Sequence, residues 1–106
     1  MPLLITYFNL KDGVNEEEFV KKAKEFLGYI QGKVEGLGSV KLYQHYLIGA
    51  NPRTYQMHVE FKDFGMWDRY VASFEKDTEV ARLRREWINL IDMKTNYDET
   101  VREIPL

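Results

Sequence analysis

The chain has 106 residues, of which 44% are hydrophobic and 14% aromatic, so residues 1–106 are expected to form one domain with a real core. A net charge of −2 and a pI near 5.7 argue against a nucleic-acid-binding protein, and the lack of cysteine excludes disulfides and thiolate chemistry. No apolar run has the length of a membrane span, and the first residues lack a basic region and a cleavage site, so we expect a cytoplasmic protein without membrane attachment.

The first expected elements are a strand and a helix. Residues 3–10 are rich in β-branched, aromatic and aliphatic side chains and precede the turn residues Lys11-Asp12-Gly13, which predicts a strand. Asn15 is a preferred N-cap for the helix that follows, and glutamates 16–18 place negative charge where the helix dipole favours it. Spacings of three and four predict a buried stripe of Phe19, Ala23, Phe26, Leu27, Ile30 and Val34.

Three glycines at four-residue intervals lie in or near the second half of this helix: Gly28, Gly32 and Gly36. Each of the first two costs roughly 1 kcal/mol relative to alanine inside a helix. We favour a weak C-terminal half that stops at Gly36. The alternative is a close approach of another backbone along the line of glycines.

Two alternating segments, residues 40–48 and 54–62, predict a β-hairpin around Gly49-Ala50-Asn51-Pro52. One face is apolar and the other carries both histidines of the protein. If Ile48 and Arg53 close the loop, the register pairs Lys41 with Glu60, Tyr43 with His58 and His45 with Gln56. A shift by one residue would turn the polar set toward the core, whereas a shift by two remains open.

Residues beyond the hairpin predict a broken helix and a last strand. Asp63 is a candidate N-cap for a helix with Trp67, Tyr70, Val71 and Phe74 on one side, and Trp67 is expected in the core. After a break at Lys76-Asp77-Thr78, a second helical run carries an inner stripe of Val80, Leu83, Trp87, Leu90 and Ile91. Residues 93–104 alternate loosely and are interpreted as a final strand that ends at Pro105.

The order β-α-β-β-α-(α)-β predicts an α+β domain of the ferredoxin-like type, a four-stranded antiparallel sheet with the helices on one face. The other sheet face would then be bare. It would carry Tyr43, His45, Leu47, Gln56, His58 and Glu60. Such a set is too aromatic for a surface in water and too polar for a dry core. Two sheets paired face to face would cover it and enclose a semi-polar cavity.

Several short segments follow one another along nearly the whole chain: Leu10-Lys11-Asp12-Gly13-Val14, Glu16-Glu17-Glu18-Phe19, Phe61-Lys62-Asp63-Phe64, Trp67, Phe74-Glu75-Lys76-Asp77 and Arg85-Glu86-Trp87. In these segments and in its layout the chain resembles the dimeric α/β-barrel superfamily, which includes NIPSNAP-like proteins, antibiotic-biosynthesis-type monooxygenases and stress-responsive barrel proteins. The resemblance implies a homodimer that forms a barrel, with a ligand cavity in each protomer or between them, and no single reaction. In some cofactor-independent oxygenases of this group an asparagine on the first strand assists the chemistry, which makes Asn9 a candidate.

His58 and His45 are the candidate catalytic residues, because a histidine with a pKa near neutrality can act as a general acid or base. His58 is preferred, since Tyr43 and Glu60 can flank it. The candidate ligand-binding set is Tyr43, Gln56, Glu60, Tyr7 and Asn9. The alternative is that both histidines are ordinary polar residues of a sheet or of a dimer interface.

Metal, haem and anion sites are not favoured by the sequence. Two histidines and Glu60 would supply three zinc ligands, but His45 and Glu60 are far apart in the predicted register. Haem-degrading members of the resembled group use a histidine on the second main helix, and this chain has none from Asp63 onward. Arginines 82, 84 and 85 alternate with glutamates and are interpreted as a solvated helix face. We therefore expect neither a metal nor a cofactor.

Three functions remain open from the sequence. The first is a cofactor-independent monooxygenase or isomerase for a small aromatic or enolisable compound, in which His58 transfers the proton while Tyr43, Asn9 and His45 position the substrate. The second is a non-catalytic binding or stress-associated protein that holds a metabolite in the same cavity. The third is a structural dimer whose histidines only satisfy the interface.

Overall fold

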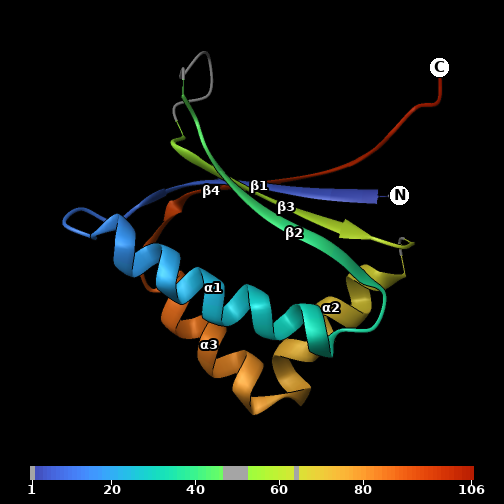
Figure 1. Cartoon of the computed structure of the whole chain (residues 1–106), viewed down its shortest axis with the longest axis horizontal. Helices are drawn as coiled ribbons and strands as arrows, with labels where there is room; N and C mark the ends of the chain where they lie inside the picture. The colour runs from blue at the N-terminus through green and yellow to red at the C-terminus, as the bar shows by residue number, and fades with distance from the viewer. Residues whose placement is uncertain (1, 47–52, 64) are drawn as a thin grey trace.

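The computed structural model describes residues 2–46, 53–63 and 65–106 (Figure 1). In chain order it contains β1 (Pro2–Leu10), α1 (Glu16–Lys33), β2 (Leu37–Gln44), β3 (Tyr55–Phe61), α2 (Met66–Lys76), α3 (Thr78–Ile88) and β4 (Ile91–Arg102). The predicted order of elements is confirmed, whereas the predicted loop from Gly49 to Pro52 lies outside the described residues. No helix in the described parts of the chain is both long and apolar enough to cross a membrane.

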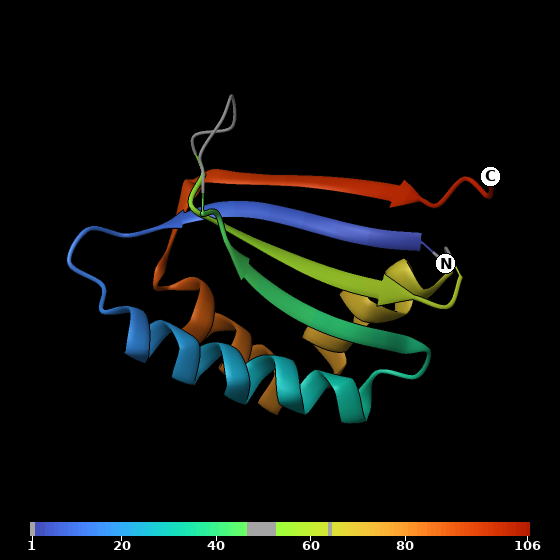
Figure 2. The ribbon, with the colours of Figure 1, turned by 45° about the horizontal axis from the view of Figure 1, so that its top comes forward.

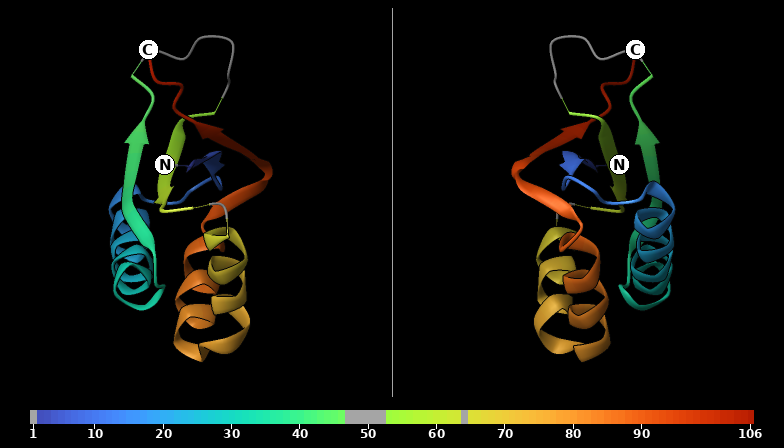
Figure 3. Two further views of the ribbon diagram at one scale, coloured as in Figure 1. Left: turned by 90° about the vertical axis from the view of Figure 1, so that its right-hand side faces the viewer. Right: turned by 90° about the vertical axis from the view of Figure 1, so that its left-hand side faces the viewer.

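Within the described residues, the strands form one antiparallel four-stranded sheet in the order β2-β3-β1-β4. The helices all lie against the same face of this sheet (Figures 1, 2 and 3), which confirms the predicted ferredoxin-like fold. Because β1 is a central strand, its side chains alternate between two environments. Leu4, Thr6 and Phe8 are buried beneath the helices, while Ile5 and Tyr7 lie on the other face. We call that second, uncovered side the open face.

An aromatic core fills the space between the sheet and the helices. The ring of Phe8 packs against the rings of Phe19 and Trp87, with centroids 5.7 and 6.0 Å apart. The predicted stripe of α1 is confirmed, since Phe19, Ala23, Phe26, Leu27, Ile30 and Val34 are all buried. From α3, Val80, Leu83 and Trp87 are buried as predicted, but Ile91 begins β4 instead of extending the helix. Each large side chain buried here contributes about 1.5–3 kcal/mol of transfer free energy.

The predicted cap of α1 and the predicted break between α2 and α3 are confirmed, whereas the predicted cap of α2 is not. The Oδ1 of Asn15 accepts a hydrogen bond from the backbone N–H of Glu17 at 2.7 Å, so the predicted cap of α1 is confirmed. Asp77 separates α2 from α3 and caps α3 with its carboxylate. The predicted cap at Asp63 is wrong, because α2 begins at Met66 after Gly65. The Asp63 carboxylate instead lies 3.5 Å from the guanidinium of Arg69.

The glycines of α1 weaken the helix without serving a close contact. A Cβ added at Gly28 or Gly32 would meet no atom within 4 Å, so the alternative of a close backbone approach is contradicted. The helix ends at Lys33, and Gly36 has a φ of +83°, in the left-handed region where glycine is favoured.

Gly28→Ala and Gly32→Ala should therefore each raise the free energy of unfolding by about 1 kcal/mol, because alanine loses less backbone entropy in a helix. Urea denaturation followed by circular dichroism measures this change. The matched control is Gly36→Ala, which should lower stability because of its positive φ. A loss of stability in Gly28→Ala would contradict this account of α1.

Candidate functional site

The strands β2 and β3 pair in a register that differs by two residues from the predicted one. Lys41 lies opposite His58 and Tyr43 opposite Gln56, so the predicted pairs Lys41–Glu60 and Tyr43–His58 are wrong. The residues just before β3 are held separately, by contacts with β1 and β4. The Asn9 side chain on β1 accepts a hydrogen bond from the Thr54 N–H at 2.7 Å, and the Arg53 side chain donates to the Thr95 carbonyl at 2.9 Å. These two residues are thus held by β1 and β4.

A shift of two residues keeps every side chain of the hairpin on its predicted face. His45 now lies beside Thr54, whose carbonyl accepts a hydrogen bond from the His45 N–H at 2.7 Å. The predicted pairing of His45 with Gln56 is therefore wrong for the backbone. The side chains of these two residues nevertheless meet on the open face.

His45, Gln56 and His58 form a continuous hydrogen-bonded chain, which we call the histidine–amide chain. The Gln56 Nε2 lies 2.8 Å from the His45 Nε2, and the Gln56 Oε1 lies 2.6 Å from the His58 Nε2. Because the amide nitrogen donates and the amide oxygen accepts, this arrangement places the proton of neutral His45 on Nδ1 and that of neutral His58 on Nε2. The two histidines are thus coupled through one amide.

Tyrosine rings surround the histidine–amide chain. The ring centroid of Tyr43 lies 4.7 Å from that of His58, and Tyr7 lies 6.2 Å from His45 and 6.0 Å from Tyr97. Burial raises the pKa of Tyr7, and the nearby carboxylate of Glu99 raises it further. Tyr43 and Tyr97 are 43% and 50% exposed in the single chain. The open face is therefore aromatic, semi-polar and uncovered.

His58 is the histidine whose environment disfavours a positive charge. Partial burial lowers its pKa below the ordinary value of 6.5, and the ammonium group of Lys41 on the paired strand lowers it further. At pH 7 the imidazole is therefore neutral, which is the form that accepts a proton in general base catalysis.

Glu60 and Asn9, both predicted for this site, join neighbouring strands. The Glu60 carboxylate accepts a hydrogen bond from the Ser39 hydroxyl at 2.7 Å. The Asn9 Oδ1 is bonded to the Thr54 backbone, and the Asn9 N–H donates to the Thr95 hydroxyl at 2.8 Å. In the part of the chain that the structure describes, no three His, Asp or Glu side chains gather closely enough to hold a metal ion.

A second candidate site, absent from the sequence prediction, lies between the sheet and the helices. It is a cavity of about 120 Å³ bounded by β1, β3, β4, α1, α2 and α3. We call it the helix-side cavity. Apolar side chains such as Phe8, Met57 and Ile91 form much of its wall. Its polar lining residues are Thr6, Tyr70, Arg84, Trp87, Asn96 and Asp98.

Trp87 presents an unpaired donor beside this cavity. The residue is 4% exposed, and its indole Nε1 has no hydrogen-bond partner among the described residues. Leaving such a buried N–H unpaired costs about 1–3 kcal/mol. An acceptor atom bound in the helix-side cavity would recover part of that cost. The indole therefore favours a ligand with a carbonyl or hydroxyl oxygen.

The helix-side cavity is also lined by one phenol and two charged groups, those of Tyr70, Arg84 and Asp98. Burial raises the pKa of Tyr70 to about 12, an effect that the guanidinium of Arg84 opposes and the carboxylate of Asp98 reinforces. The Arg84 guanidinium carbon lies 4.4 Å from the ring centroid of Phe74. A phenol, a cation and an anion are thus available to orient a polar group of a bound molecule.

The interpretation of arginines 82, 84 and 85 as a solvated helix face is corrected at Arg84. Arg82 does pair with Glu79 and Glu86 on the solvated side of α3, but Arg84 lines the cavity. Arg84 is four residues after Val80 and three before Trp87, a helical spacing that could have identified its inward face.

Trp67, expected in the core, is 42% exposed. Because α2 begins only at Met66, Trp67 lies in the first turn, where its ring contacts those of Phe61 and Tyr70 at centroid distances of 6.2 and 6.0 Å. The residue contributes to the edge of the helix-side cavity and to a second hollow beside Pro2 and Thr100.

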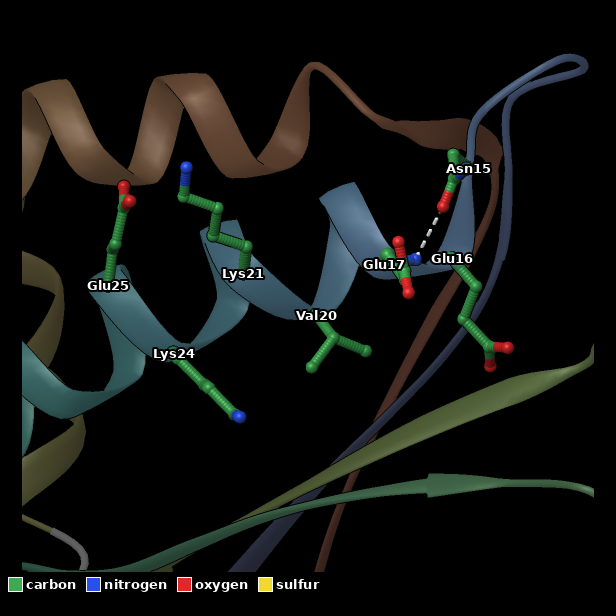
Figure 4. Close-up of a pocket in the computed structure, with 7 residues that line it drawn as sticks. All are labelled: Asn15, Glu16, Glu17, Val20, Lys21, Lys24 and Glu25. Carbon is green, nitrogen blue, oxygen red and sulfur yellow. Dashed lines mark hydrogen bonds between the residues drawn. The ribbon is translucent and has the colours of Figure 1, made fainter.

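A wider hollow of about 770 Å³ lies beside the first half of α1 (Figure 4). Figure 4 shows its charged side chains diverging, with Lys21 and Glu25 directed to one side of the helix and Glu16 and Lys24 to the other. The Glu16 carboxylate is already bonded to the hydroxyl of Tyr55 at 2.9 Å. Because no set of polar groups converges there, this surface is not a candidate ligand site.

The sequence matches no family model and no curated protein, whereas the structure is similar to several solved structures. It superposes on the Arabidopsis thaliana protein At3g17210 with a TM-score of 0.80 at 12% identity, over 100% of this chain and 98% of the other. A mutant of SnoaB, a cofactor-independent oxygenase from Streptomyces nogalater, gives 0.72 at 10% identity over 99% and 94%. A dimeric protein of unknown function and ferredoxin-like fold from Bacteroides fragilis gives 0.64 at 13% identity over 96% and 95%. At these identities the likeness shows a shared ferredoxin-like fold.

The pKa of His58 provides a direct test of the open-face geometry. It should lie below 6.5, and Lys41→Met should raise it. Because the folded pKa is below the unfolded one, the stability that neutral His58 provides is present above pH 6.5 and is lost as the pH falls through the folded pKa. NMR titration of the imidazole C–H signals measures the pKa, with Lys62→Met as the control that should leave it unchanged. A value at or above 6.5 would contradict the described environment.

Proposed function

We propose that this protein is a homodimer that associates through its open face and binds a small aromatic or enolisable compound. The dimer is supported by the exposed apolar and aromatic area of that face, to which Tyr43, Tyr97 and Val101 contribute. Charges of both signs, Lys41 and Glu99, lie on the same face, so a two-fold axis can bring unlike charges together. A solved structure with the same fold is described as dimeric.

The observation that carries the ligand part of the proposal is the unpaired N–H of Trp87 beside the helix-side cavity. An apolar cavity of about 150 Å³ in another protein holds benzene, so the volume of about 120 Å³ here suits a compound of roughly one ring. Trp87 would donate to a carbonyl or hydroxyl oxygen of the ligand. Arg84 and Asp98 would orient a second polar group.

Catalysis at the open face is the second candidate function, favoured by the histidine–amide chain. A neutral His58 can take a proton from a phenol or an enolisable C–H, and Gln56 holds its ring through the Nε2 hydrogen bond. His45, Tyr43 and Tyr7 would then position a substrate held between two open faces. The fold is compatible with such chemistry, since it is shared with a cofactor-independent oxygenase. Glu60 and Asn9 would act indirectly, by holding the strands in register.

Replacing Trp87 with phenylalanine removes the N–H and keeps one six-membered aromatic ring in the core. The free protein should lose only about 1 kcal/mol of stability, because the cavity left by the smaller side chain is destabilising while loss of the unpaired buried donor offsets part of that cost. The Kd for a ligand from a panel of phenol, resorcinol and acetylacetone should rise about fivefold to tenfold, the equivalent of one hydrogen bond. Urea denaturation and isothermal titration calorimetry give the two quantities.

His58→Asn is the matched comparison for the ligand experiment. It should leave the affinity of the helix-side cavity unchanged, and it should abolish any turnover of the bound compound if the open face is catalytic. Loss of affinity in His58→Asn with no change in Trp87→Phe would move the ligand to the open face. Equal affinity in the wild type and Trp87→Phe for every bound compound would contradict the cavity proposal.

Tyr43→Asp should dissociate the dimer, because a carboxylate would replace an aromatic side chain that the second copy covers. Analytical ultracentrifugation at micromolar concentrations measures the oligomeric state. The control is Gln44→Asp, an exposed residue on the same strand whose side chain lies on the other face of the sheet. A wild-type protein that sediments as a monomer, or a Gln44→Asp variant that dissociates like Tyr43→Asp, would contradict the proposed interface.

A further inference from the structure

We propose that the histidine–amide chain makes association of the two open faces dependent on pH, so that the dimer dissociates when His45 and His58 are both protonated. This inference rests on the homodimer of the proposed function. It adds the means by which assembly is regulated.

The amide of Gln56 can satisfy only certain protonation states of its two neighbours. It offers one accepting oxygen and one donating nitrogen, which lie 2.6 Å from the His58 Nε2 and 2.8 Å from the His45 Nε2. With both rings neutral, His58 donates to the oxygen and His45 accepts from the nitrogen. Both hydrogen bonds are then formed.

One added proton can also be accommodated. A protonated His58 still donates its Nε2–H to the Gln56 oxygen, and a protonated His45 is satisfied when the amide turns over and His58 presents its unprotonated nitrogen. Two protonated rings present two donors to a single amide oxygen. One hydrogen bond is then lost, and two positive charges flank the same short side chain.

The other groups on this face do not supply enough opposite charge to offset this change. Lys41, opposite His58 on β2, is itself positive. The carboxylate of Glu60 on β3 accepts a hydrogen bond from the neutral Ser39 hydroxyl and keeps its negative charge, which the positive charge of Lys41 on the same face opposes. From the far side of the face, β1 brings Tyr7 and β4 brings Glu99, which lies beside Tyr7. The remaining rings around the chain, Tyr43 on β2 and Tyr97 on β4, are neutral phenols.

Dimerisation makes the doubly protonated state of the histidine–amide chain less favourable. In the single chain the histidines are only partly buried, so water can solvate a protonated pair. In the dimer the second copy covers the face and brings its own His45 and His58 into the same enclosed space. Charged groups that lose both water and a hydrogen-bond partner are strongly disfavoured. The monomer therefore binds more protons than the dimer, and lowering the pH favours the monomer.

The test is the dimer Kd, measured by analytical ultracentrifugation between about pH 8 and about pH 5, on either side of the ordinary histidine pKa. For the wild type, Kd should rise at least about tenfold as the pH falls, the effect of roughly one unit of pKa difference between monomer and dimer. Gln56→Glu should reverse this trend. A carboxylate of nearly the same shape accepts a hydrogen bond from each protonated ring, so the dimer should become tighter at the lower pH.

Controls distinguish failure of this inference from failure of the proposed dimer. His45→Asn and His58→Asn each leave one imidazole and should flatten the pH dependence, whereas Glu99→Gln should retain it. A wild type that is monomeric at both pH values would remove the proposed dimer itself. A wild-type dimer with the same Kd at both pH values, or a Gln56→Glu variant that weakens as the wild type does, would overturn the regulatory inference while the dimer stands.

Discussion

The packing of Phe8 against Phe19 and Trp87 is the contact on which the rest of the structure depends. It fixes which face of the central strand β1 meets the helices. Because neighbouring residues of a strand point to opposite sides, it also places Tyr7 on the open face, beside His45 and Tyr97. Alternate side chains of β1 thus contribute to the core and to the open face.

Both candidate sites follow from this arrangement, and each contains a group that the single chain leaves incompletely satisfied. On the helix side, Trp87 packs in the core but leaves its N–H unpaired among the described residues. On the open face, aromatic side chains remain exposed around a hydrogen-bonded histidine pair. A bound compound would satisfy the first and a second copy of the chain the second. The proposed ligand and the proposed dimer therefore occupy opposite faces of the same sheet.

The faces of the strands and the buried stripes of the helices could be predicted because they depend on local periodicity. The register of β2 against β3 could not, because a shift of two residues leaves every side chain on the same face, so the alternating pattern does not distinguish the predicted pairing from the observed one. Arg84 is masked in the sequence by its charged neighbours Arg82 and Arg85, although its spacing from Val80 and Trp87 places it on the inner face of the helix. The unpaired N–H of Trp87 could not be predicted from the sequence, because it depends on the absence of a hydrogen-bond acceptor among the side chains packed around the indole.

Native mass spectrometry in the presence of phenol or acetylacetone tests the central claim, a ligand-binding dimer, most directly. The account predicts a species of about twice 12.6 kDa that carries added ligand mass, and a Trp87→Phe dimer that loses that added mass under the same conditions. A monomer of 12.6 kDa, or a dimer whose ligand mass is identical in the wild type and Trp87→Phe, would contradict it.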